Sequence, residues 1–137
     1  MQTTEAAERR RNTVLASLVL FRKLAPDVTM SEILAFLYVA ENPGVRIKEL
    51  ADLMQTTSAT ASRASRALLA PDAPGSLPPG RGWLFMAANG REAVSRHLYL
   101  SPSGRALSAR LNLLIESARP IRDARQARAS GSDEPRP

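Results

Sequence analysis

The chain has no cysteine and a single histidine, His97, among its 137 residues. Without cysteine, disulfide bonds and thiolate chemistry are excluded, and the composition fits a cytosolic protein. One histidine with no cysteine and no nearby carboxylate cluster does not make a plausible zinc site. We therefore interpret His97 as a surface residue of a strand and expect neither a metal nor any other cofactor.

Long apolar runs are also missing. The two clearest runs, residues 14–21 and 33–40, are too short to cross a bilayer, so we expect no membrane association. Arg9-Arg10-Arg11 precedes the first run, as basic residues do in a secretory signal. Arg22-Lys23 closes that run early and no small-residue cleavage site follows, so we reject a signal peptide.

Motifs that would indicate catalysis are absent too. The chain has many serines, but no recognisable motif places an activating base beside any of them. Gly80-x-Gly82 lacks the remaining residues of a phosphate-binding glycine motif. We therefore predict that the protein is not an enzyme.

Lysine is scarce, with 2 lysines against 17 arginines, and the net charge of +6 is unevenly placed. Residues 1–54 carry seven basic and seven acidic side chains, whereas residues 55–110 carry seven arginines against two acidic residues. Residues 111–137 carry five basic and four acidic side chains. A surface that is merely solvated would spread the excess more evenly, so the distribution favours a polyanionic partner.

Helical spacing dominates the first part of the chain. Apolar residues recur at three- and four-residue steps from about residue 4 to 25, which predicts an amphipathic helix ended by Pro26. Thr29 can cap a second helix that runs to about Glu41. Glu32, three positions after Thr29, completes the pattern of a capping box.

Residues 46–70 have the pattern of a helix-turn-helix. The inner face of the first helix consists of Leu50, Ala51 and Met54. Gln55-Thr56 makes a polar turn, and Thr57 can cap the second helix with its hydroxyl. The second helix is built from small and hydroxylated residues plus two arginines, so its outer face is thin, polar and cationic. Such a face can enter the major groove of DNA and offer hydroxyls and guanidiniums to bases and phosphates.

A loop, a hairpin and a last helix follow. Residues 71–82 are rich in proline and glycine and lack periodicity, which predicts a loop. Residues 83–100 predict a β-hairpin, because Asn89-Gly90 is a two-residue turn signal and the residues after it alternate as in a half-buried strand. Ser101-Pro102 has the pattern of a helix start, and we expect that helix over residues 102–128.

This order of elements is that of a winged helix. The predicted fold is mainly α with a small β-hairpin wing, and helices at about residues 4–25 and 102–128 flank the helix-turn-helix as dimerisation helices. We assign residues 1–128 to one domain and expect residues 129–137 to be a disordered tail.

Four segments resemble the MarR family of bacterial transcription regulators. They are Val28-Thr29-Met30-Ser31-Glu32-Ile33-Leu34, Glu49-Leu50-Ala51, Ser58 to Leu68, and Leu100-Ser101-Pro102-Ser103-Gly104-Arg105. The last corresponds to a Leu-Thr-x-x-Gly-Arg-like run of the family. The resemblance implies a cytoplasmic homodimer that acts on the bacterial nucleoid, repression more often than activation, and often a small-molecule effector, although the sequence identifies none.

The chain departs from the family pattern in three places. The stretch between Leu68 and Gly82 is much longer than family members need between the recognition helix and the wing. Asn89-Gly90-Arg91 stands where the family has Asp-x-Arg at the wing tip, so the carboxylate that would steady the arginine is missing. The helical region at the C-terminal end is short.

Outward-facing side chains of the motif and the wing tip are the expected contacts to double-stranded DNA. These candidate DNA-binding residues are Arg46, Lys48, Thr57, Ser58, Thr60, Ser62, Arg63, Arg66, Asn89 and Arg91. Ala61, Ala64 and Leu68 form the stripe that should pack inward. Arg63 can read guanine O6 and N7, and Arg91 can enter a narrow minor groove. The alternative interpretation is a small-residue helix with solvated arginines and a Thr57 cap that has no role in DNA binding.

The flanking helices offer more apolar surface than one small winged domain can cover, which favours a homodimer. The expected interface residues are Val14, Leu15, Leu18, Phe21, Leu107, Leu111, Leu114 and Ile121. Sequence-specific binding of a pseudo-palindromic operator is the function that we predict. A different hypothesis is a winged-helix interaction module whose arginines and proline-rich loop contact an acidic protein.

Overall fold

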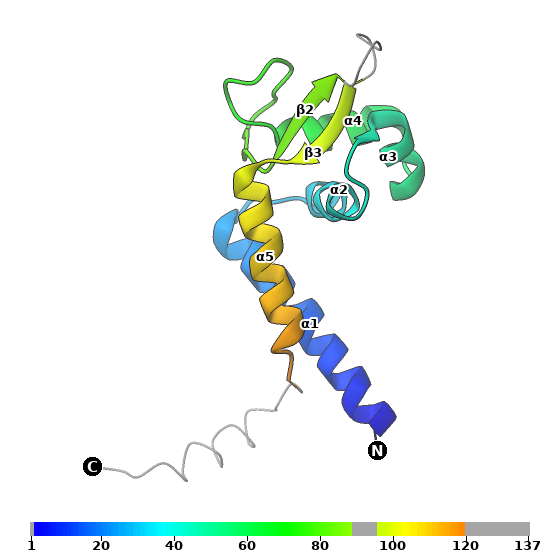
Figure 1. Cartoon of the computed structure of the whole chain (residues 1–137), viewed down its shortest axis with the longest axis vertical. Helices are drawn as coiled ribbons and strands as arrows, with labels where there is room; N and C mark the ends of the chain where they lie inside the picture. The colour runs from blue at the N-terminus through cyan, green and yellow to red at the C-terminus, as the bar shows by residue number, and fades with distance from the viewer. Residues whose placement is uncertain (1, 89–95, 120–137) are drawn as a thin grey trace, which may run out of the picture.

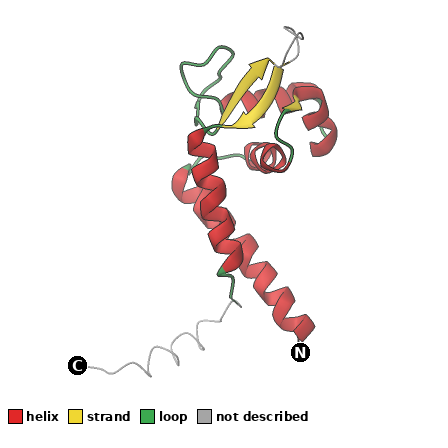
Figure 2. Cartoon of the chain, viewed as in Figure 1, coloured by secondary structure: helices red, strands yellow, loops and turns green. Residues whose placement is uncertain are grey.

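The computed structural model describes residues 2–88 and 96–119. Its elements are α1 (Gln2–Leu24), α2 (Met30–Glu41), β1 (Val45–Arg46), α3 (Ile47–Met54), α4 (Ser58–Ala67), β2 (Leu84–Ala88), β3 (Arg96–Leu100) and α5 (Pro102–Glu116). Figure 1 shows a head made of α2, α3, α4 and the strands, from which α1 and α5 project side by side. The predicted fold class, mainly helical with a small antiparallel sheet, is confirmed (Figure 2).

Three helices begin at a hydroxyl cap that the sequence predicts. The side chains of Thr29, Thr57 and Ser101 each accept a hydrogen bond from the backbone N–H three residues later, at 3.0–3.1 Å. The capping box at Thr29 needs a correction. The Glu32 carboxylate accepts a hydrogen bond from the Thr29 hydroxyl and pairs with Arg81, because a buried guanidinium is a stronger partner than a backbone N–H.

The sheet contains a strand that the sequence does not reveal. Its order is β1-β3-β2, with both pairs antiparallel. In β1, Val45 pairs with Leu98 and Arg46 pairs with His97. A strand of two residues has no alternation to read, so only its pairing across the chain identifies it.

Strands β2 and β3 pair antiparallel, as the predicted hairpin requires, with Leu84 opposite Leu100 and Ala88 opposite Arg96. Leu98 pairs with both Val45 and Met86, which fixes the register of β3 between its two neighbours. Asn89, Gly90 and Arg91 lie outside the described residues.

α5 is shorter than predicted. It ends at Glu116, and Ser117 is its C-cap, so the expected helix over residues 102–128 is wrong for residues 117–119. A proline ring in a helix clashes with the carbonyl four residues earlier, and Pro120 stands four residues after Glu116. Residues 120–137, which include Ile121 and the predicted tail, lie outside the described part of the chain.

An aromatic cluster joins the projecting helices to the head. Phe21 of α1, Phe36 of α2 and Trp83, just before β2, make edge-to-face contacts with ring centroids 5.8–5.9 Å apart. Edge-to-face pairs of this kind stabilise a core beyond the area that they bury. The core therefore extends from the head into the base of α1.

The exposed apolar surface of α1 and α5 differs from the prediction. Phe21, Leu107 and Leu111 are buried within one chain, so they do not belong to the surface that a second copy would cover. Leu114 packs partly against the same core. The large apolar residues that remain exposed on the described parts of these helices are Val14, Leu15, Leu18 and Leu24 on α1, and Leu113 and Ile115 on α5. Helical spacing identifies an apolar face but does not show whether the same chain already covers it.

The structure explains why a glycine stands at position 104, in the first turn of α5. A Cβ atom at this position would overlap the carbonyl oxygen of Trp83. The same oxygen accepts a hydrogen bond from the N–H of Ser101 at 3.0 Å. A glycine is therefore needed for the first turn of α5 to lie directly on the backbone before β2.

Candidate nucleic-acid interface

The recognition helix α4 packs against α2 and α3 through small side chains. Ala61, Ala64 and Leu68 are buried, as predicted. Ser65 is buried as well, and its hydroxyl donates to the carbonyl oxygens of Ala61 and Ser62 at 2.8 and 3.1 Å. Sequence reasoning missed this residue, although its four-residue spacing from Ala61 places it near the inner face. Close approach of α2 and α3 leaves the opposite side of α4 free.

The turn of the helix-turn-helix is made by Gln55, which has a left-handed backbone with φ of 54°. Its N–H donates to the carbonyl oxygen of Asp52, and the N–H of Thr56 donates to that of Ala51. These bonds satisfy the carbonyls at the end of α3. They redirect the chain so that Thr57 stands at the N-terminus of α4.

The outer face of α4 is polar and cationic. Ser58, Arg63 and Arg66 are exposed, whereas Thr60 and Ser62 are half-buried at its sides. The Thr57 hydroxyl donates to the Thr60 hydroxyl oxygen at 3.1 Å, and the Arg63 guanidinium donates to the same oxygen at 3.5 Å. The structure thus brings these predicted residues together on one surface, with Arg63 held over the first turn.

Arg46 and Lys48, at the start of α3, differ in how free their side chains are to bind an anion. Both the backbone N–H and the side chain of Arg46 donate to Glu49, at 3.0 and 3.1 Å. The backbone hydrogen bond, followed by the side-chain hydrogen bond, lowers the pKa of Glu49. Arg46 is therefore partly neutralised by its neighbour, while Lys48 is exposed and has no ion pair among the described residues. Asn89 and Arg91, the wing-tip candidates, lie outside the described residues.

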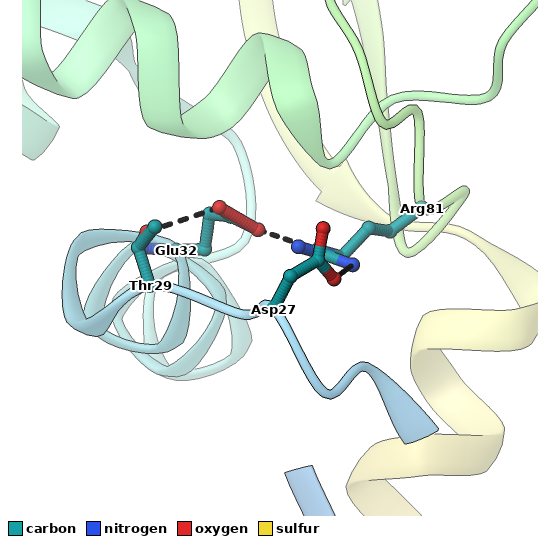
Figure 3. A network of polar contacts seen from close by, with 4 residues as sticks. All are labelled: Asp27, Thr29, Glu32 and Arg81. Atoms are coloured by element: carbon teal, nitrogen blue, oxygen red, sulfur yellow. Dashed lines mark hydrogen bonds and ion pairs between the residues drawn. The ribbon is translucent and has the colours of Figure 1, made fainter. Parts of the chain in front are cut away.

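A buried ion pair stands beside the interface and was not predicted. Arg81, in the proline-rich loop, donates from Nε to Glu32 at 2.5 Å and from Nη1 to Asp27 at 3.1 Å (Figure 3). The side chains of Arg81 and Glu32 are only 8% and 7% exposed, whereas that of Asp27 is 74% exposed. Arg81 and Glu32 are 49 positions apart, so no local pattern could have paired them.

Electrostatics favour the charged forms of Arg81 and Asp27, as their pKa values show. Burial lowers the pKa of Arg81, but hydrogen bonds and charge from Glu32 and Asp27 outweigh it and hold the pKa above its ordinary value. The hydrogen bond from Arg81 is the main reason that the pKa of Asp27 is lowered. The Arg81 guanidinium also lies 6.0 Å from the centre of the Trp83 ring, within range of a cation–π contact.

The backbone around Arg81 completes the C-terminal end of α4. The N–H of Arg81 donates to the carbonyl oxygen of Ala67 at 2.9 Å, and that of Trp83 donates to Leu68 at 2.8 Å. Leu77, in the middle of the loop, donates to the carbonyl oxygen of Arg66 at 3.1 Å. Carbonyls at the end of a helix lack partners within the helix. The long loop between α4 and β2 therefore supplies the hydrogen-bond donors for these carbonyls.

His97 lies on β3, as predicted for a strand residue, but it is half-buried. Its Nδ1 lies 2.8 Å from the carbonyl oxygen of Gly44. Its Nε2 is buried and has no hydrogen-bond partner among the described residues. The Gly44 carbonyl lies this close because β1, which the sequence does not show, pairs with β3 directly after Gly44.

We also searched the described ranges for a metal site, a membrane-spanning helix and a pocket. Residues 2–88 and 96–119 contain no group of three His, Cys, Asp or Glu side chains that could hold a metal ion. No helix within these ranges is long and apolar enough to cross a membrane. A hollow of about 410 Å³ lies between α1 and α5. Its lining residues are Ala16, Val19, Leu20, Lys23, Arg110, Leu113 and Leu114.

Comparison with known proteins identifies the fold. No protein-family model matches the sequence, and no curated protein matches it. Among solved structures, RV1404 from Mycobacterium tuberculosis aligns with this chain at a TM-score of 0.61 and 13% identity. The alignment covers 91% of this chain and 74% of RV1404. FabT from Streptococcus pneumoniae, solved in complex with DNA, aligns at a TM-score of 0.54 and 14% identity. That alignment covers 90% of this chain and 82% of FabT.

A third solved structure carries the family name. A MarR-family transcriptional regulator from Silicibacter pomeroyi covers 94% of this chain and 73% of its own, with a TM-score of 0.51 and 20% identity. The predicted resemblance is therefore confirmed for the fold, which is the winged helix of MarR-family regulators.

Proposed function

We propose that this protein is a sequence-specific DNA-binding transcription regulator. It acts as a homodimer on a pseudo-palindromic operator, with repression as the favoured outcome, and it works on the nucleoid in the cytoplasm. Two recognition helices enter successive major grooves, and the wings reach the flanking minor grooves.

The outer face of α4 carries this proposal. It places exposed hydroxyl and guanidinium groups on a helix whose other side is buried against α2 and α3. Hydroxyls and guanidiniums are the groups that read base edges and bind phosphates in the major groove. A helix that served only the core would carry larger apolar side chains, and its polar face would be narrower.

Selection from random duplex DNA tests this function. Purified protein is mixed with a pool of random duplexes, bound molecules are recovered and sequenced, and the enriched sites are measured by titration. An enriched inverted repeat supports a dimeric regulator. Recovery of no enriched sequence, with equal weak binding to every duplex, contradicts sequence-specific binding.

Arg63→Ala should separate base reading from phosphate binding. We expect the variant to lose base preference at one position of each half-site, at about 1–3 kcal/mol for each lost bidentate contact. Titration of the selected operator and of single-base variants measures this preference. Arg10→Ala, which removes an exposed arginine from α1, is the matched control and should leave base preference unchanged. Equal weakening on all sequences would make Arg63 a phosphate contact.

Exposed apolar side chains on the projecting helices support the dimer. Leu113 and Ile115 of α5 are 63% and 57% exposed, and Val14 and Leu15 of α1 are 59% and 50% exposed. Soluble monomers rarely leave a large contiguous apolar patch uncovered. Two-fold pairing of these helices would cover the patch and set the recognition helices about one DNA turn, roughly 34 Å, apart.

Leu18→Glu should break the dimer. Leu18 is 40% exposed on α1, and a carboxylate at the proposed interface would be buried without a partner, at a cost of several kcal/mol. Sedimentation velocity should show dimers for the natural protein and monomers for the variant, with loss of tight operator binding. Leu37→Glu on α2, where the natural leucine is 39% exposed, is the control and should remain dimeric. A natural protein that is monomeric at micromolar concentration refutes the dimer.

A further inference from the structure

Residues 81–83, which we call the junction, connect the recognition helix to both projecting helices. Their backbone binds the end of α4, where the N–H of Arg81 donates to Ala67. The Trp83 ring packs on Phe21 of α1. At α5, the Ser101 hydroxyl donates to the carbonyl oxygen of Gly82, and the Ser101 N–H donates to that of Trp83. A shift of the junction would therefore move α4, α1 and α5 relative to one another.

The Arg81 side chain is the polar part of the junction. It reaches Glu32 in the first turn of α2 and Asp27 in the connection between α1 and α2 (Figure 3). The Thr29 hydroxyl holds the second oxygen of Glu32 at 3.0 Å. The planar guanidinium can donate in two directions at once, which a lysine ammonium cannot do in the same geometry. The network thus fixes the connection between α1 and α2 against the end of α4.

We propose that Arg81 is a positioning residue for DNA binding, which sets the angle between α4 and the projecting helices. This inference rests on the proposed dimer. If α1 and α5 pair with a second copy, that angle determines the distance between the two recognition helices. Arg81 itself is too deeply buried to contact DNA.

The role predicts a selective defect. Specific binding needs both recognition helices in register with two half-sites. Non-specific binding depends mainly on the number of phosphates that basic side chains neutralise. A variant that keeps the charge but loses the geometry should therefore weaken specific binding and leave non-specific binding nearly unchanged.

Arg81→Lys is that variant, and operators with altered half-site spacing provide the first readout. We expect affinity for the best operator to fall by about tenfold and non-specific affinity to change by less than about twofold. The natural protein should prefer one spacing, whereas Arg81→Lys should accept spacers that are longer or shorter by a base pair with little further loss. A merely structural role would lower affinity at all spacings alike.

A distance measurement gives a second readout that does not depend on DNA. The chain contains no cysteine, so Ala59→Cys, at an exposed position of α4, supplies a unique site for a spin label. Pulsed electron spin resonance then reports the distance between the two recognition helices of a dimer. We expect a narrow distribution with Arg81 present and a clearly broader one in the Arg81→Lys background. Val39→Ala, which weakens the core of α2 away from the junction, is the control for lost stability and should keep the narrow distribution.

The outcomes distinguish the inference from the function on which it rests. The same distance distribution and the same spacing preference in Arg81→Lys and the natural protein would overturn the positioning role. A natural protein that gives no intermolecular distance would refute the dimer and, with it, this role. A natural protein that gives a narrow distance but selects no operator would refute the proposed function, and broadening in Arg81→Lys would then still support control of the helix angle.

Discussion

Replacing Arg81 by methionine is expected to lower the free energy of unfolding by about 3–5 kcal/mol, the typical cost of removing one partner from a buried ion pair. Glu32 would remain almost fully buried, with its Thr29 hydrogen bond but without a counter-charge. The cation–π contact with Trp83 would be lost as well. Urea denaturation followed by circular dichroism measures the change.

Two further variants show where that cost arises. Asp27→Asn removes the exposed arm of the network and should cost much less than Arg81→Met, because exposed ion pairs contribute little to stability. The double variant Glu32→Leu with Arg81→Met replaces the buried pair by apolar groups and should recover much of the loss, because buried pairs contribute little net stability. Equal small losses in Arg81→Met and Asp27→Asn would mean that the buried Glu32 arm is no stronger than a surface pair.

DNA affinity is expected to fall by about 10³–10⁵ between 50 and 200 mM salt if the dimer neutralises about six to ten phosphates. The physical cause is the release of counterions that condense on the duplex. The arginine excess in residues 55–110, which include α4 and the wing, supplies the positive charge. Fluorescence anisotropy of a labelled operator across a salt series measures the slope.

Arg66→Ala tests whether α4 contributes to that slope. Arg66 is exposed near the end of the recognition helix, and each phosphate contact that is lost should make the logarithmic slope shallower by about 0.9. Arg10→Ala, in the N-terminal half of α1, should leave the slope unchanged. A flat salt response of the natural protein would contradict DNA binding and favour the alternative of an acidic protein partner.

Local signals in the sequence predicted most of the elements that form the interface. Thr57 and Ser101 cap helices through the backbone N–H three residues later, so each cap depends on a few consecutive residues. The stripe of Ala61, Ala64 and Leu68 follows from helical spacing alone, and it also determines which side chains of α4 face outward. These interactions span a few positions along the chain, so composition and spacing were sufficient to predict them.

Contacts between distant segments could not be predicted in this way. β1 exists only because Val45 pairs with Leu98, and that pairing also brings the Gly44 carbonyl to the ring of His97. The register of β3 likewise depends on Leu98, which pairs with Val45 and Met86 on the two neighbouring strands. In each case the deciding partner lies many positions away in the sequence.

The sequence by itself determined that this protein has a winged helix with a polar, cationic recognition helix, because helical spacing and caps act within single elements. Only the tertiary structure decided which apolar residues of the flanking helices remain exposed, since Phe21 and Leu107 are covered by the same chain and Leu113 is not. It also brought Arg81 to Glu32 across 49 positions, because a buried charge requires a partner that chain topology alone can supply.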